Sequence, residues 1–132
     1  MRILAILLAL SGCGGTFGRS EPTGLKHANR IALGLAAAAL ACDWGQTHSA
    51  AAGGWRGTYE GNPIMGPSPS AAEVGLYMAG VGAAFVVVWQ LLPPRLRPAL
   101  AGGMLAVEAH TVVGNLETTP GLCGVAGGRT RP

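Results

Sequence analysis

The chain has 132 residues, of which 49% are hydrophobic and 11% are charged, and its formal net charge is +3. Soluble domains average about a quarter charged residues, so this composition offers too little polar surface for a soluble fold. The nine Lys and Arg residues are scattered and form no aromatic-interleaved basic patch, which argues against nucleic-acid binding.

The chain begins with a segment that is typical of an export signal. Residues 1–12 read MRILAILLALSG, in which one positive charge precedes an apolar run too short to span a bilayer. The next residue is a cysteine, and Leu-Ser-Gly-Cys at 10–13 resembles the lipobox of bacterial lipoproteins. That resemblance implies cleavage before Cys13 and lipid attachment to its thiol. The alternative is a chance cysteine in an ordinary hydrophobic start.

A linker and a first membrane span are expected next. Residues 13–30 are glycine-rich and polar in their first half, which predicts the linker. Residues 31–52 begin with the apolar run IALGLAAAALAC but continue with polar side chains. Twelve apolar residues do not cross a bilayer, so the polar half must face the inside of a bundle or lie near an interface.

The second span is the strongest in the sequence. Glycines and three prolines predict a loop over 53–70. Ser70 and Glu73 then match a capping box, which marks the start of a helix. The apolar run 74–92 follows, and the proline pair after it ends the helix because proline cannot donate a helical hydrogen bond.

A third span is expected at 99–116, interrupted by Glu108, His110 and Asn115, and a flexible glycine-rich tail at 117–132. Every long segment has a helical rather than a strand-like pattern. The predicted fold is therefore all-α: about three transmembrane helices, forming one membrane domain over 31–116, behind an N-terminal signal segment.

Small residues recur four positions apart in each predicted span, and this spacing lets helix backbones approach closely in membranes. Chance spacing in alanine-rich helices is the alternative. The residues concerned are Ala37, Ala41 and Gly45; Gly75, Ala79 and Ala83; and Ala99 and Gly103.

Polar residues share helix faces in the first and third spans. Asp43 and Thr47 are four residues apart, and Glu108 and Asn115 are seven apart. Ionisable groups in membrane spans are costly and usually face the bundle interior. We therefore expect these two faces to meet, with at least one carboxyl protonated. A structural role and a role in proton or ligand chemistry both remain open.

These residues belong to a longer pattern that resembles a family of small, uncharacterised bacterial membrane proteins. The pattern is D-W-x-Q-T at 43–47 followed by E-x-N-P-I-M-G at 60–66, with a later Val-Glu and a closing Asn. The resemblance implies membrane residence and one shared polar cluster, but no activity. The chain departs from the pattern at His110 and in its tail. The expected cluster comprises Asp43, Gln46, Thr47, Glu60, Asn62, Glu108 and Asn115.

Other chemistry has little support in the sequence. The three histidines and three cysteines show no metal-ligand spacing, and no phosphate loop or catalytic triad pattern is present, so we expect neither a metal nor a cofactor. A disulfide between Cys42 and Cys123 requires Cys42 near the exported face, and we do not expect one.

The sequence thus predicts a small non-enzymatic membrane protein, a scaffold or an interaction subunit, in a bacterial inner membrane. Its expected partners are the lipid bilayer and further copies of itself or another membrane protein. One alternative is a membrane enzyme or proton-coupled carrier that uses Asp43, Glu60 and Glu108; another is a phage-type pore former. Orientation stays open because an exported Cys13 conflicts with the distribution of positive charges.

Overall fold

The structure is a computed structural model, and it describes residues 22–56 and 59–116. This part of the chain folds into three helices without strands: α2 (Thr23–Ala52), α3 (Ala71–Leu91) and α4 (Arg97–Asn115). The predicted all-α fold is confirmed. Residues 1–12 with Cys13, and the tail at 117–132, lie outside the described residues, so the predicted leader, lipid attachment and tail stay predictions.

Helix α2 begins earlier than the sequence pattern indicates. It starts at Thr23, so the second half of the linker expected at 13–30 is helical instead. Polar composition alone suggested a linker, but 23–30 contains no proline and includes leucine, lysine and alanine, which are good helix formers. Asn29 is buried, and its Nδ2 donates to the Pro94 carbonyl at 3.1 Å, which fastens this turn to the α3–α4 connection.

Helix α3 has the ends that its capping signals predict. The Ser70 hydroxyl accepts from the Glu73 backbone N–H at 3.3 Å, and the Glu73 carboxylate accepts from the Ser70 N–H at 2.7 Å. The helix ends at Leu91, ahead of the proline pair. Helix α4 follows after a short turn, with a proline in its first turn, where the missing N–H costs nothing.

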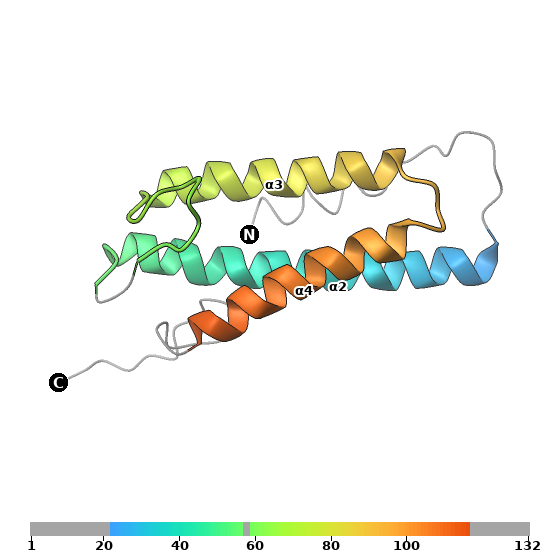
Figure 1. Ribbon diagram of the computed structural model, residues 1–132, viewed down its shortest axis with the longest axis horizontal. Coiled ribbons are helices and arrows are strands. Elements are labelled where there is room, and N and C mark those ends of the chain that lie inside the picture. The colour runs from blue at the N-terminus through green and yellow to red at the C-terminus, as the bar shows by residue number, and fades with distance from the viewer. Residues whose placement is uncertain (1–21, 57–58, 117–132) are drawn as a thin grey trace.

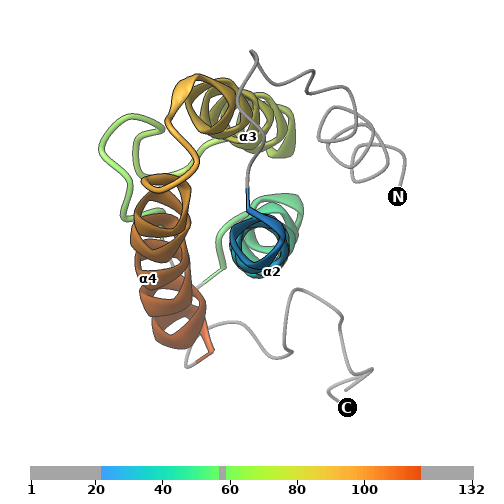
Figure 2. The same ribbon diagram turned by 90° about the vertical axis from the view of Figure 1, so that its right-hand side faces the viewer.

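Helix α2 is the central element, and both α3 and α4 pack against it, α4 more extensively. Figure 1 shows α3 running alongside α2 while α4 crosses α2 obliquely, and Figure 2 shows the three helices end on. The core cluster that joins all three consists of Ala36, Phe85, Trp89 and Ala101. A second cluster, nearer the α2–α3 loop, contains Leu40, Val74 and Met78.

The predicted small-residue stripes on α3 and α4 do not form the helix contacts. Ala83, Ala99 and Gly103 are exposed, and a Cβ built on Gly75 or Gly103 would meet nothing within 4 Å. In α3 the face against α2 instead carries large residues at helical spacing: Val74, Met78, Phe85 and Trp89. These side chains fill most of the contact, so Ala83, Ala99 and Gly103 are left on outward faces, while the small residues that are buried are Gly82 of α3 and Ala101 of α4.

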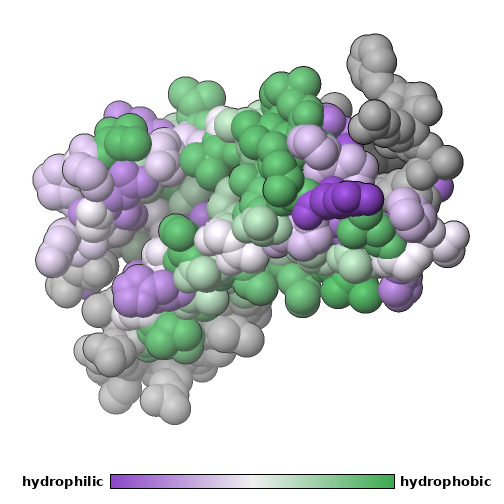
Figure 3. Space-filling view, turned by 45° about the vertical axis from the view of Figure 1, so that its right-hand side comes forward, coloured by the Kyte–Doolittle hydropathy of each residue, from purple (hydrophilic) through white to green (hydrophobic). Residues whose placement is uncertain are grey.

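One described helix, α3, is long and apolar enough to cross a membrane, and only 22% of its apolar window is buried inside the structure. In Figure 3, hydrophobic residues gather across the middle of the face in view, and hydrophilic residues are concentrated toward its ends. Membrane crossing by α2 and α4 does not follow from their composition alone.

Candidate functional site

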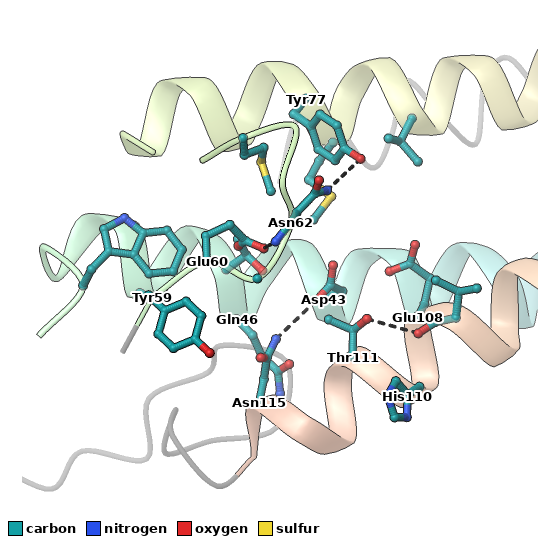
Figure 4. A pocket seen from close by; sticks show the side chains of 18 residues that line it. Asp43, Gln46, Tyr59, Glu60, Asn62, Tyr77, Glu108, His110, Thr111 and Asn115 are labelled. Atoms are coloured by element: carbon teal, nitrogen blue, oxygen red, sulfur yellow. Dashed lines mark hydrogen bonds between the residues drawn. The ribbon is translucent and has the colours of Figure 1, made fainter. Parts of the chain in front are cut away.

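A polar cavity of about 500 Å³ lies between the three helices and the α2–α3 loop (Figure 4). All seven residues of the predicted polar cluster line it, although they come from segments up to 72 positions apart. They are Asp43, Gln46 and Thr47 from α2, Glu60 and Asn62 from the loop, and Glu108 and Asn115 from α4.

The α2 wall of the cavity is built from buried polar residues. Asp43 and Thr47 are each 5% exposed and Gln46 is fully buried. Their positions continue the inward stripe that begins with the apolar Ala36 and Leu40, so the same helix face changes from apolar to polar along its length. The cavity therefore occupies one end of the bundle, and the core cluster with Trp89 fills the other.

The side-chain amide of Gln46 is held in one orientation, but only one of its two polar atoms has a hydrogen-bond partner. Its Nε2 donates to the Val112 carbonyl of α4 at 3.4 Å, which fixes the assignment of the two amide atoms. Its Oε1 is buried and has no hydrogen-bond partner. Buried polar atoms are nearly always paired, so an unpaired carbonyl oxygen beside a cavity is a feature that needs an explanation.

Asp43 is the centre of the contacts between α2 and α4. Asn115 Nδ2 donates to Asp43 Oδ1 at 3.4 Å, and Thr47 and Glu108 both hydrogen-bond to the Asp43 carboxyl group. A hydrogen bond between two carboxyl groups requires a proton on one of them, so the expected protonation of at least one of Asp43 and Glu108 stays a prediction. The predicted meeting of the α2 and α4 polar faces is confirmed by this geometry.

The α2–α3 loop brings Glu60 and Asn62 to the cavity through its own turn. Glu60 Oε1 accepts from the Asn62 N–H at 2.8 Å, and Asn62 Oδ1 accepts from the Ile64 N–H at 3.0 Å. Asn62 Nδ2 then donates to Tyr77 Oη of α3 at 2.8 Å. Gly66 completes the turn at φ +75°, a conformation that glycine adopts without strain.

Aromatic residues complete the cavity, and the sequence pattern did not single them out. Trp55 follows α2 with φ +54°, and its Nε1 donates to the Pro69 carbonyl at 2.7 Å, which ties the two ends of the loop together. Tyr59 and Tyr77 also line the cavity, with His110 and Thr111 of α4. Thr111 could have been found because it lies three residues after Glu108 on the same face.

The charge of the cavity is one-sided. Its described lining holds three carboxyl groups, from Asp43, Glu60 and Glu108, and neither lysine nor arginine. No three His, Cys, Asp or Glu residues of the described part stand together as a metal site. The arrangement therefore offers hydrogen-bond acceptors and negative charge over an extended surface rather than at one point.

Cys42 lies next to the cavity wall in sequence and is disulfide-bonded, and the expectation against a bond with Cys123 stays a prediction because Cys123 is outside the described residues. The partner of Cys42 is outside the described residues. No family model, curated protein or solved structure matches the chain. The resemblance to a family of small bacterial membrane proteins therefore stays a prediction, as does any role for the polar cluster.

Proposed function

We propose that the chain is a small, non-enzymatic helical protein of a bacterial inner membrane, a subunit that works by binding through its polar cavity. The observation that carries membrane residence is the outward face of α3. Leu76 and Leu91 are 78% and 79% exposed, and Val87 is 57% exposed. A single exposed leucine needs no explanation, but a continuous apolar helix with most of its surface outward needs lipid or a partner around it.

The dimensions of α3 agree with this proposal. Its 21 residues rise about 31 Å at roughly 1.5 Å per residue, which matches a hydrocarbon core of about 30 Å. Arg95 lies in the turn after α3, and Arg30 is brought to the same end by the contact between Asn29 and Pro94. Positive residues at one end of a span are typical of membrane flanks.

Three of the polar residues that lower the hydropathy of α2 and α4 do not face outward. Asp43, Gln46 and Glu108 are buried between them. Leu35 of α2 and Val113 of α4, in contrast, are 52% and 64% exposed. A membrane bundle places polar groups inside and apolar groups toward lipid, so this distribution supports three spans.

The test is extraction of membranes with alkaline carbonate, using the Cys13→Ser variant so that no lipid anchor contributes. We expect the protein to stay in the pellet and to fractionate with the inner membrane. Release into the supernatant of a protein that still folds would overturn the proposal.

A proton-coupled carrier is the second candidate, and the Asp43–Glu108 pair favours it. A shared proton inside a polar cavity is the arrangement that proton relays use. Three helices enclose little of a substrate path, so such a carrier would require several copies. Purified protein in liposomes with an internal pH dye separates the candidates: a carrier moves protons with its substrate and loses that movement in Asp43→Asn, whereas a binding subunit moves none.

A further inference from the structure

We propose that the polar cavity binds a small organic cation that carries N–H donors, such as a protonated primary amine. This inference rests on the proposed function, since it names the ligand class of the same cavity. It has three supports: an unpaired buried acceptor, amide donors that are already engaged, and acidic groups with aromatic residues in the lining.

The unpaired acceptor is Gln46 Oε1. Gln46 is 0% exposed, lines the cavity and has its Nε2 committed to the Val112 carbonyl, so the amide cannot turn to satisfy its oxygen without losing that bond. Leaving a buried carbonyl oxygen unpaired is costly. A ligand in the cavity that donates an N–H to this atom would remove the cost.

The amide donors of the cavity are already engaged within the protein. Asn62 Nδ2 donates to Tyr77, and Asn115 Nδ2 donates to Asp43. Around them stand the carboxyl oxygens of Asp43, Glu60 and Glu108, which accept. A ligand that brought only acceptors would find donors in the side chains of Tyr59, Tyr77 and His110 but none in the amides, whereas an ammonium group brings three donors to the carboxyl groups.

The acidic and aromatic residues of the cavity lining favour the same class of ligand as its hydrogen-bonding groups do. With one proton held between Asp43 and Glu108, the three carboxyl groups still leave a negative potential in a described lining that has no lysine or arginine, and this potential draws in a cation. Tyr59 is 75% exposed and lines the cavity together with Trp55, and aromatic rings of this kind attract cations. The absence of a three-ligand cluster in the described residues argues for an organic cation rather than a metal ion.

The size of the cavity limits the ligand to a small molecule. A volume of about 500 Å³ is within the range of roughly 300–1,000 Å³ for small-molecule sites. The cavity is bounded by three helices and a loop that is hydrogen-bonded to α3, so much of its wall is formed before a ligand arrives. A preformed wall lowers the entropy that binding must overcome.

The experiment measures binding to the full chain, purified in lipid nanodiscs, by calorimetry and thermal stability. The probes are n-butylammonium chloride, 1,4-diaminobutane dihydrochloride, sodium butyrate, 1-butanol and magnesium chloride. We expect saturable binding and a raised melting temperature with the two amines, and neither effect with the other three. Loss of one hydrogen bond to a charged group predicts that Gln46→Met weakens amine binding about tenfold or more.

Gln90→Met is the matched control, because Gln90 is an exposed glutamine of α3 outside the cavity lining, and it should bind like the wild type. Glu60→Gln provides a second variant in case Gln46→Met fails to fold; it keeps an oxygen for the Asn62 N–H, removes the charge and should weaken binding. Equal responses to amine, butyrate and butanol, binding of magnesium alone, or unchanged amine binding in both cavity variants would overturn the inference. Failure of the membrane proposal is separate, since it appears in carbonate extraction and not in ligand binding.

Discussion

Asn62 of the α2–α3 loop donates its side-chain amide to the hydroxyl of Tyr77 on α3 at 2.8 Å. This bond closes the cavity, because the same asparagine accepts from Ile64 and so holds the turn that presents Glu60. One residue thus connects the internal geometry of the loop to the helix beside it. The position of Glu60 at the cavity depends on both connections.

Tyr77→Phe tests only the hydrogen bond between Asn62 of the loop and Tyr77 of α3. It removes the hydroxyl but keeps the ring, and we expect a loss of stability of about 1 kcal/mol, the usual contribution of one such bond. Asn62→Ala should cost more, because it removes the turn bond as well. Melting curves of the purified protein, with protease sensitivity of the loop, measure both. Equal stability of the two variants would contradict the double role of Asn62.

Ser70→Ala tests the N-terminal cap of α3. Its hydroxyl accepts from Glu73, and the loss of a serine cap costs about 1 kcal/mol. We expect a lower melting temperature and a smaller change with Ser70→Asp, since aspartate also caps helices. Ser68→Ala is the control, because Ser68 is exposed and lies before the helix. A similar loss in Ser68→Ala would show that the effect is not capping.

Local signals predicted much of this fold correctly. The capping box predicts where α3 begins and the proline pair predicts where it ends, and the structure has this helix at Ala71–Leu91. The start of α2 was missed because a polar, lysine-containing turn looks like a linker when its tertiary contact, Asn29 with Pro94, is unknown. The helix contacts were also misplaced, since spacing alone does not reveal that Phe85 and Trp89 face α2 while Ala83 of the predicted stripe is exposed.

The polar cluster was easier to predict than its walls. Asp43, Thr47, Glu108 and Asn115 are costly inside a membrane span, so their faces were expected to meet, and the structure brings them together. Trp55, Tyr59 and Tyr77 carry no such cost in a loop or at a helix end, so nothing in the sequence placed them beside the carboxyl groups. Whether a neutral aromatic residue lies beside these carboxyl groups depends on how the helices pack. A single sequence does not reveal that packing.

Trp89→Ala tests the core cluster at the opposite end from the cavity. Trp89 is 5% exposed, contacts Phe85 at 6.0 Å between ring centroids and lies beneath the Arg97 guanidinium at 5.9 Å. Truncation of such a residue removes packing and the cation–π contact, at a cost on the order of 3 kcal/mol. Size-exclusion profiles after heating measure the loss. The exposed Leu91→Ala should behave like the wild type.

The leader gives a prediction that is independent of the helices. If Cys13 is acylated, wild-type cells should incorporate labelled palmitate into the protein, and Cys13→Ser should remove the label and block processing. The variant should still sediment with membranes, because α3 does not depend on the anchor. Wild-type protein without label would remove the lipobox interpretation and leave the membrane proposal intact.

The last prediction concerns Asp43. A carboxyl group facing lipid at the centre of a span costs about 2.5–3.5 kcal/mol on insertion scales, and the structure avoids that cost by turning Asp43 toward Glu108, Asn115 and Thr47. Asparagine keeps an acceptor for Asn115 and supplies a donor to Glu108, so Asp43→Asn should fold at wild-type levels. Leucine satisfies none of these partners, and Asp43→Leu should reduce the amount of folded protein because buried partners are left unpaired.

Infrared spectroscopy and crosslinking test Asp43 directly, because they report on the proton expected between Asp43 and Glu108 and on the proximity of these two residues. Infrared spectra of the wild type should contain a protonated-carboxyl band that Asp43→Asn shifts, since the proton then has one carboxyl group instead of two. Cysteines introduced at 43 and 108, in a background without the native cysteines, should crosslink readily. The control pair places cysteines at Leu35 and Val113, which are exposed. Efficient crosslinking of the control pair together with none at 43 and 108 would show that the polar faces of α2 and α4 do not meet.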